Sequence, residues 1–341
     1  MAETFKYFPE WQSHVFDTNK KGYNPQIAWW LAYCSQIAYE NKITVAKYLK
    51  IANFENVIFF DAQGSQAFLA KHPGVEPGQP FAVLAFRGTE NDSIDILTDI
   101  NFVRRLFPNE NIVEEVQATA AESKKNISQP PDKKLYAHGG FLQGVENIWG
   151  CALRDGIKQK FFPDETSQWL GSPGISNAIC QLKDTPLYIT GHSLGGALAT
   201  MAAYKAVIYE LDGTIKIGGI YTFGSPRVAQ FDLANEINNY FGDRSYRVVN
   251  FIDVIPRIPL RVPPLWHFKH IHHLVYFNSN RQVVLGKQNS FALLLEDISV
   301  ILLVLLEVGL SFLTFGRYTP VTIKKHMINE YIKDIEASLK C

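Results

Sequence analysis

The stretch YITGHSLGGALATMAAY, residues 188–204, changes character at its centre. An apolar run typical of a buried strand leads into a glycine-rich turn, and an alanine-rich run with helical character follows. The turn is GHSLG at 191–195, which matches the pattern GxSxG. This order of strand, tight turn and helix predicts that Ser193 lies at the carboxyl end of a strand in an α/β sheet.

Ser193 has the surroundings that a nucleophilic serine needs. A side chain on so sharp a turn requires neighbours without Cβ atoms, and Gly191 and Gly195 provide them. The following helix start offers N–H groups and the positive end of its dipole, which stabilise an oxyanion. A serine in an ordinary glycine-rich turn is the alternative. His192 is adjacent, but side chains diverge at a sharp turn, so we expect it to pack or to form a structural hydrogen bond.

Outward from this turn, strands and helices alternate along the chain. Strands are predicted at 55–62, 66–70, 80–86, 186–190, 217–224, 245–253 and, as the last strand, 273–278. Helices are predicted at 25–40, 92–107, 140–162, 197–211, 231–242 and, as the closing helix, 323–339. This alternation predicts an α/β fold with a mostly parallel central sheet flanked by helices on both faces. No linker divides the chain, so we predict a single domain over residues 1–341.

The composition excludes several classes of function. Basic and acidic residues balance at 33 each, so nothing indicates a nucleic-acid partner. The four cysteines lack the spacing of a zinc site or of a dense disulfide framework. The N-terminal sequence MAETFKYFPEWQSHVF does not resemble a secretory signal. We therefore expect a cytoplasmic or membrane-associated protein.

The apolar run ISVILLVLLEVGLSFLTF, residues 298–315, is the one membrane-like segment. It carries Glu307 in its middle, and Glu296 and Asp297 stand just before it. A spanning helix needs about 20 apolar residues with few charges. A buried or interface helix is therefore the favoured interpretation, and membrane insertion is the alternative.

A nucleophilic serine in this setting needs an acid and then a base, in the chain order Ser, Asp or Glu, His. Asp253 closes the strand 245–253 and precedes a rigid turn, VIPRIP, so it is the predicted acid. The other candidates fall in loops or at helix starts, where capping is the expected role: Asp212, Asp232 and Asp243.

The histidine must be chosen from five that follow Asp253. Four form the cluster WHFKHIHH before the last predicted strand: His267, His270, His272 and His273. Only His326 follows that strand, so we predict it as the general base in preference to His270. The cluster has no carboxylates at metal-ligand spacing, and no metal is predicted. In this mechanism His326 deprotonates Ser193, while Asp253 fixes its tautomer and stabilises the imidazolium.

Acyl transfer also needs two N–H donors that bind the oxyanion. The residue after the nucleophile, Leu194, is one predicted donor. The loop at 86–89 follows an earlier strand, and Thr89 there can add a donor, although a plain strand exit is the alternative. The segment at about 91–108 follows this loop and has apolar residues at helical spacing, so we predict a lid, with a fixed core helix as the alternative.

These motifs, in this order, resemble the class 3 lipase family of fungal type. The matching segments are GHSLGGALA around Ser193, FRGTE at 86–90, AHGGF at 137–141, TFGSPRV at 222–228 and NFIDVIPRIP at 250–259. FKHIHHLVYF resembles the family's segment with a structural histidine, at His270, and KKHMINEY its segment with the catalytic histidine, at His326. The resemblance runs from about residue 25 to 335 and implies an α/β-hydrolase fold. By matching positions, it supports Ser193, Asp253 and His326 as a triad and Thr89 with Leu194 as the oxyanion hole.

The resemblance implies a serine carboxylic-ester hydrolase acting on lipid esters at a lipid–water interface, foremost a triacylglycerol lipase, without metal or organic cofactor. Phospholipase A1 or galactolipase activity, a short-chain carboxylesterase, and a catalytically silent binding module are the alternatives. The sequence departs from the family at two places. Ile96 stands where many members have a lid tryptophan, and the apolar insertion at about 291–315 has no clear counterpart. Peripheral membrane contact is a further expectation from that insertion.

Overall fold

The structure is a computed structural model, and it describes twelve segments of the chain. They are 7–75, 79–89, 104–106, 135–150, 174–209, 215–259, 268–271, 273–286, 298–300, 302–303, 306–307 and 320–340. Of the predicted lid at 91–108, all but 104–106 lies outside these segments. Of the apolar insertion at 291–315, seven positions between 298 and 307 are described.

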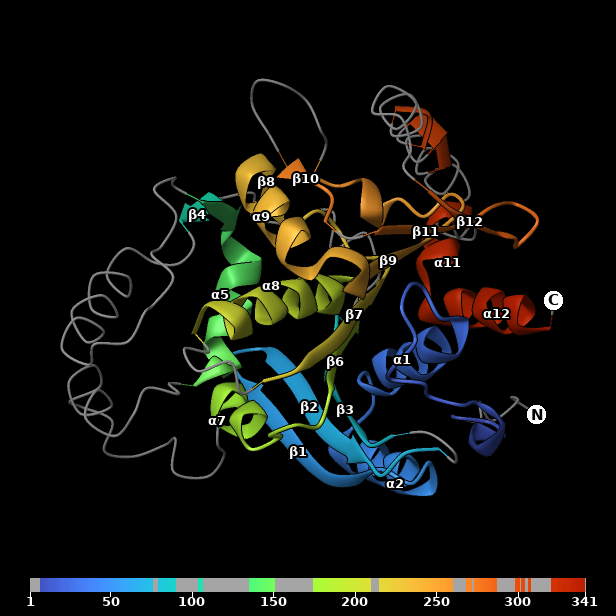
Figure 1. Cartoon of the computed structure of the whole chain (residues 1–341). Coiled ribbons are helices and arrows are strands. Elements are labelled where there is room, and N and C mark those ends of the chain that lie inside the picture. Colours follow the sequence, from blue (N-terminus) through green and yellow to red (C-terminus); the bar gives the residue numbers. More distant parts are fainter. Residues whose placement is uncertain are drawn as a thin grey trace.

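An eight-stranded sheet runs through the molecule (Figure 1), in the order β1-β2-β3-β6-β7-β9-β11-β12. Its strands are β1 Glu55–Ala62, β2 Ser65–His72, β3 Phe81–Phe86, β6 Leu187–His192, β7 Ile217–Phe223, β9 Ser245–Asn250, β11 His273–Phe277 and β12 Val283–Leu285. From β3 to β11 all neighbours pair in parallel, and antiparallel pairs stand only at the two edges. The predicted mostly parallel sheet is confirmed.

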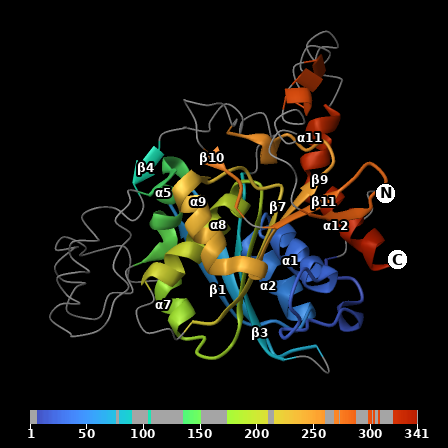
Figure 2. The ribbon, with the colours of Figure 1, turned by 45° about the horizontal axis from the view of Figure 1, so that its top comes forward.

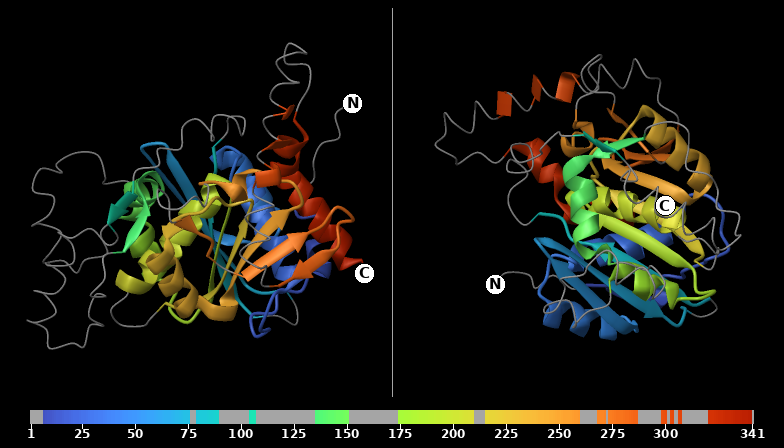
Figure 3. Two further views of the ribbon diagram at one scale, coloured as in Figure 1. Left: turned by 90° about the horizontal axis from the view of Figure 1, so that it is seen from above. Right: turned by 90° about the vertical axis from the view of Figure 1, so that its left-hand side faces the viewer.

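Helices cover both faces of this sheet (Figures 2 and 3). One face carries α5 Gly139–Trp149, α8 Leu194–Tyr209 and α9 Phe231–Phe241, and the other carries α1 Pro25–Ile37, α2 Lys42–Ile51 and α12 Ile328–Leu339. Alternate residues of a strand point to opposite faces. In β3, Leu84 and Phe86 therefore pack with the first group of helices, whereas Phe81 and Val83 pack with the second. The two cores on either side of the sheet follow from this alternation.

A smaller sheet lies beside α5 and α9. Its strands, in the order β10-β8-β5-β4, are β10 Phe268–Lys269, β8 Ala229–Gln230, β5 Tyr136–His138 and β4 Arg104–Leu106. The helix predicted over 92–107 is therefore wrong at 104–106. That segment has helical apolar spacing, but its backbone pairs antiparallel with β5. The remaining short elements are α7 Ile175–Cys180, α11 Val321–His326, and the 3-10 turns η1 Trp11–Ser13, η2 Gly242–Arg244 and η3 Ile255–Arg257.

Three further elements differ from the prediction: one helix is shorter, and one strand and one helix were not predicted. The helix predicted over 140–162 ends at Trp149, where Gly150 takes a positive φ of 67°, and residues 151–162 lie outside the described segments. The strand predicted to be the last is followed by β12, joined through a turn that the Asn278 side chain closes by accepting hydrogen bonds from two backbone N–H groups. Helix α2 was not predicted; its N-cap is Asn41, whose side chain accepts from the Thr44 N–H at 2.9 Å.

The closing helix predicted over 323–339 is two helices. At Met327 the backbone is extended, with φ −59° and ψ 133°, so α11 ends at His326 and α12 begins at Ile328. Helix α12 then packs along α1 and contacts β9. The break leaves His326 at the end of its own short helix.

The described part of the apolar insertion is helical and projects from the body of the molecule (Figures 1 and 3). In the described segments of the chain, no helix combines the length and the apolar character that crossing a bilayer requires.

Candidate active site

The turn between β6 and α8 holds Ser193 in a left-handed conformation, with φ 57°. A non-glycine residue adopts this conformation at a cost and persists there only when its surroundings fix it. Here the Ser193 N–H donates to the Phe223 carbonyl at 2.9 Å, and the Gly196 N–H donates to the Ser193 carbonyl at 3.0 Å. The strand, turn and helix predicted around Ser193 are confirmed.

The glycines of this turn have no room for a Cβ atom. A Cβ on Gly191 would overlap the Gly195 carbonyl, and one on Gly195 would overlap the Phe86 carbonyl and lie 3.0 Å from the Gly88 nitrogen. The nucleophile turn thus packs directly against the loop that leaves β3. This close packing is the physical reason for the GxSxG pattern.

Asp253 and His326 form a buried hydrogen-bonded pair. The Nδ1 atom of His326 lies 2.8 Å from Oδ2 and 3.0 Å from Oδ1 of Asp253. Asp253 follows β9, and His326 ends α11, so two distant segments meet at the carboxyl edge of the sheet. A carboxylate only accepts hydrogen bonds when ionised, so Nδ1 is the donor and Nε2 carries the lone pair. The pairing of the two residues predicted as acid and base is present.

Ser193 lies next to this pair without a hydrogen bond to it. Its N–H contacts Phe223, and the next residue, Gly224, would place a Cβ 3.0 Å from His326 Nδ1 and 2.9 Å from Asp253 Oδ2. Within the described residues, Ser193 Oγ and His326 Nε2 are both buried and neither has a hydrogen-bond partner. Catalytic hydrogen bonds are often long without substrate. The roles of nucleophile and base stay predictions, with the three side chains at one edge of the sheet.

Tyr331 is a member of the site that the sequence did not predict. Its hydroxyl donates to Asp253 Oδ2, and it accepts from the Asn250 N–H at 3.3 Å. Burial, followed by the negative charge of Asp253, raises the pKa of Tyr331 well above its ordinary value, so its hydroxyl stays a donor. The one signal was its place on the closing helix, five residues after His326.

His192 makes two hydrogen bonds and is not available as a base. Its Nε2 lies 2.6 Å from the His326 carbonyl, and its Nδ1 lies 2.9 Å from the Tyr39 hydroxyl. A carbonyl only accepts, so Nε2–H donates and Nδ1 accepts from Tyr39. Burial, with the neighbouring His326, lowers the pKa of His192 well below its ordinary value. Its predicted structural role is confirmed.

The residues predicted for the oxyanion hole lie on either side of the same packed junction. Leu194 is the first residue of α8, and the first N–H groups of a helix have no acceptor within it. Thr89 is exposed in the loop after β3. That loop is fixed at Gly88, where a Cβ would overlap the Tyr39 hydroxyl and lie 2.8 Å from the His192 carbonyl. Their role as oxyanion donors stays a prediction.

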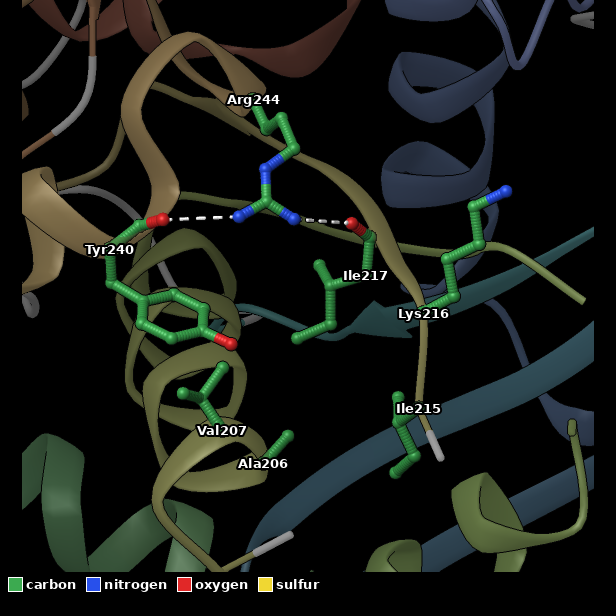
Figure 4. Close-up of a pocket in the computed structure, with 7 residues that line it drawn as sticks. All are labelled: Ala206, Val207, Ile215, Lys216, Ile217, Tyr240 and Arg244. Atoms are coloured by element: carbon green, nitrogen blue, oxygen red, sulfur yellow. Dashed lines mark hydrogen bonds between the residues drawn. The ribbon is translucent and has the colours of Figure 1, made fainter. Parts of the chain in front are cut away.

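A separate cavity of about 290 Å³ lies at the other end of β7 (Figure 4). Its lining residues are Ala206, Val207, Ile215, Lys216, Ile217, Tyr240 and Arg244. Arg244 Nη1 donates to the Ile217 carbonyl at 3.1 Å, and Nη2 donates to the Tyr240 carbonyl at 3.0 Å. Both terminal nitrogens of the guanidinium therefore have backbone acceptors. Because Ile217 is the first residue of β7, this cavity is remote from Ser193 at the carboxyl edge.

The histidine cluster is described only in part. His270 and His273 are within the described residues, whereas His267 and His272 are outside them. Over the segments that the structure covers, no three residues among His, Cys, Asp and Glu come together as metal ligands. The reactive groups that the described residues place at the site are the Ser193 hydroxyl, the His326 imidazole and the Asp253 carboxylate.

Comparisons with known proteins agree with this geometry. The family described as Lipase (class 3) matches residues 83–262. Triacylglycerol lipase OBL1 of Nicotiana tabacum is 32% identical over 174 residues, covering 49% of this chain and 30% of that protein. Triacylglycerol lipase OBL1 of Ricinus communis is 34% identical over 115 residues, covering 33% of this chain and 22% of that protein. The matches thus span less than a third of these relatives' length.

The fold has solved counterparts. The crystal structure of a lipase from Rhizopus microsporus var. chinensis is similar with a TM-score of 0.50 and 17% identity, covering 86% of this chain and 92% of that chain. At this identity the likeness concerns the fold, which is the α/β-hydrolase fold predicted from the motifs. The family match extends over more than half of the chain, from residue 83 in β3 to residue 262. The chain belongs to the class 3 lipase family.

Proposed function

We propose that this chain is a triacylglycerol lipase that works through an acyl-enzyme on Ser193. One observation carries the proposal: the buried Asp253–His326 pair stands beside a serine held at φ 57° in the turn between β6 and α8. The relatives from Nicotiana tabacum and Ricinus communis, which are named triacylglycerol lipases, support the substrate class.

The reaction follows from the order of these groups. His326 Nε2 accepts the hydroxyl proton while Ser193 Oγ attacks the ester carbonyl. The oxyanion binds the Leu194 N–H and a donor of the loop at 86–89. Collapse of the tetrahedral intermediate breaks the ester bond, and the imidazolium protonates the leaving alcohol. Water, deprotonated by His326, then attacks the acyl-enzyme, and the imidazolium returns the proton to Ser193 Oγ as the fatty acid leaves.

We also propose that the projecting helical segment touches the lipid surface and makes the protein membrane-associated. Ile298, Leu302 and Leu306 recur every four residues, and their exposed fractions are 47%, 61% and 62%. Residues four apart lie on one face of a helix. This row of three apolar side chains, the apolar row, is the kind of surface that enters a lipid interface.

The activity is tested with emulsified triacylglycerol and with p-nitrophenyl butyrate, a soluble ester. Ser193→Ala is expected to lower kcat by at least about 10⁴-fold, since it removes the nucleophile. Ser176→Ala is a matched control, because Ser176 is equally buried but lies in α7. Ester turnover that persists in Ser193→Ala rules out the acyl-enzyme, and turnover confined to phospholipids rules out the substrate class.

A further inference from the structure

Glu307 is a buried carboxylate outside the triad, and it contacts the helix that ends at His326. Only 3% of its surface is exposed. Its Oε1 accepts from the Val321 N–H at 2.9 Å, and its Oε2 accepts from the Thr322 N–H at 3.2 Å and from the Thr322 hydroxyl at 2.6 Å. Three hydrogen bonds thus join one carboxylate to the first two residues of α11.

Helix α11 depends on this contact at its first turn. It has six residues, and isolated helices shorter than about 12 residues are marginal in water. The residue before it is Pro320, which makes no side-chain cap. The first N–H groups of a helix need acceptors, and a negative charge there also interacts favourably with the dipole. Glu307 supplies acceptors for the first two of these N–H groups from 14 residues earlier in the chain.

The last residue of α11 is the predicted general base. His326 donates from Nδ1 to Asp253 at 2.8 Å, and its carbonyl accepts from His192 at 2.6 Å. The extended backbone at Met327 separates α11 from α12, so α12 does not continue the helix that holds His326. Helix α11 is therefore held at one end by the site and at the other end by Glu307.

We propose that Glu307 is a positioning residue for His326. Acting through α11, it keeps the imidazole at the place from which Nε2 reaches the Ser193 hydroxyl. This inference rests on the ester hydrolysis proposed above. Because α11 is so short, a shift of its first turn displaces its last residue, and a displacement of about 1 Å at a catalytic group can cost about 100-fold in rate.

The first test is Glu307→Gln, assayed with p-nitrophenyl butyrate. The amide places an NH₂ group against the donors of α11 and removes the charge. We expect kcat to fall about 10- to 100-fold with a smaller change in KM, since positioning of the base acts on the chemical step. Asn41→Ala is the control for loss of a helix cap, because Asn41 is exposed and caps α2, which packs against β1. It should lower the melting temperature and leave kcat unchanged.

A second readout separates positioning from general stability. Diethyl p-nitrophenyl phosphate modifies an activated serine, and His326 must take the proton in that step. In folded Glu307→Gln this modification should slow in proportion to kcat, whereas in Asn41→Ala it should not. If kcat and the modification rate both stay at the wild-type level in folded Glu307→Gln, the inference is overturned.

Thr322 provides a milder pair of variants should Glu307→Gln fail to fold. Thr322→Val keeps the shape and removes the hydroxyl that donates to Glu307, whereas Thr322→Ser keeps that donor. Thr322→Val is expected to turn over more slowly than Thr322→Ser, and equal rates contradict the inference. A wild-type protein without Ser193-dependent ester turnover would instead contradict the proposed function, so the two failures are distinguishable.

Discussion

The Asp253 carboxylate is completely buried and accepts hydrogen bonds from three sides. His326 and Tyr331 donate to it, and the Ile255 N–H donates to Oδ1 at 2.9 Å. A buried charge is costly unless it is paired and hydrogen-bonded. These donors therefore stabilise the fold and hold the carboxylate opposite the imidazole.

Tyr331→Phe tests how much one of these donors contributes. A hydrogen bond to a charged group is worth about 1.5–3 kcal/mol, so we expect the free energy of unfolding, measured with urea, to fall by that amount. Tyr33→Phe is the matched control, since the Tyr33 hydroxyl of α1 donates to the Glu336 side chain of α12 at 2.8 Å, but in a partly exposed place. If Tyr331→Phe lowers the free energy of unfolding no more than Tyr33→Phe does, the hydrogen bond from Tyr331 does not stabilise buried Asp253.

His72 makes the stability depend on pH. Its Nε2 donates to the Ala52 carbonyl at 3.1 Å, its Nδ1 accepts from the Gly74 N–H at 3.0 Å, and burial lowers the pKa of His72 to about 4. The unfolded chain binds this proton near pH 6.5, so stability is complete above that pH and is lost as the pH falls toward 4. Urea unfolding from pH 7 to pH 4.5 measures this loss. His72→Gln should reduce the slope, and an unchanged slope excludes His72 as a source.

At the scale of elements, the exit of β7 sets the space around the Asp253–His326 pair. Gly224 has φ 59°, and a Cβ there would lie within 3.0 Å of both side chains. Gly224→Ala should therefore lower kcat at least about 10-fold by displacing them. Gly64 also has positive φ but nothing within 4 Å of its Cβ position, so Gly64→Ala carries only the backbone cost. Equal kcat in both variants would show that Asp253 and His326 accommodate the added Cβ without loss of activity.

The helices and strands also show which parts of the site could be predicted from the sequence. Ser193 and Asp253 were predictable because Ser193 directly follows β6 and Asp253 comes three residues after the end of β9, and the carboxyl ends of parallel strands share one edge. Residues 323–339 have continuous helical spacing, so the local pattern did not predict the break at Met327, after which α12 packs on α1. Tyr39 and Tyr331 reach the site from helices or turns distant in sequence. Their contacts depend on the assembled fold.

At the scale of the whole molecule, the apolar row stands on a segment that also contains Glu307, which contacts the helix of His326. The double variant Ile298→Ser and Leu302→Ser removes two of its three side chains. Full burial of such a side chain is worth about 1.5–3 kcal/mol, so binding to phosphatidylcholine vesicles should weaken at least about 10-fold. Turnover of emulsified triacylglycerol should fall more than turnover of p-nitrophenyl butyrate, because only the emulsion requires docking.

Ile43→Ser provides the comparison for that experiment, because Ile43 is 83% exposed on α2, outside the apolar row. If exposed apolar residues act without regard to place, Ile43→Ser weakens vesicle binding as much as a single change in the row. If the projecting segment is the docking element, Ile43→Ser binds vesicles like the wild type while the double variant stays in solution in sedimentation with vesicles. Equal binding by all three proteins would exclude the apolar row as the contact with lipid.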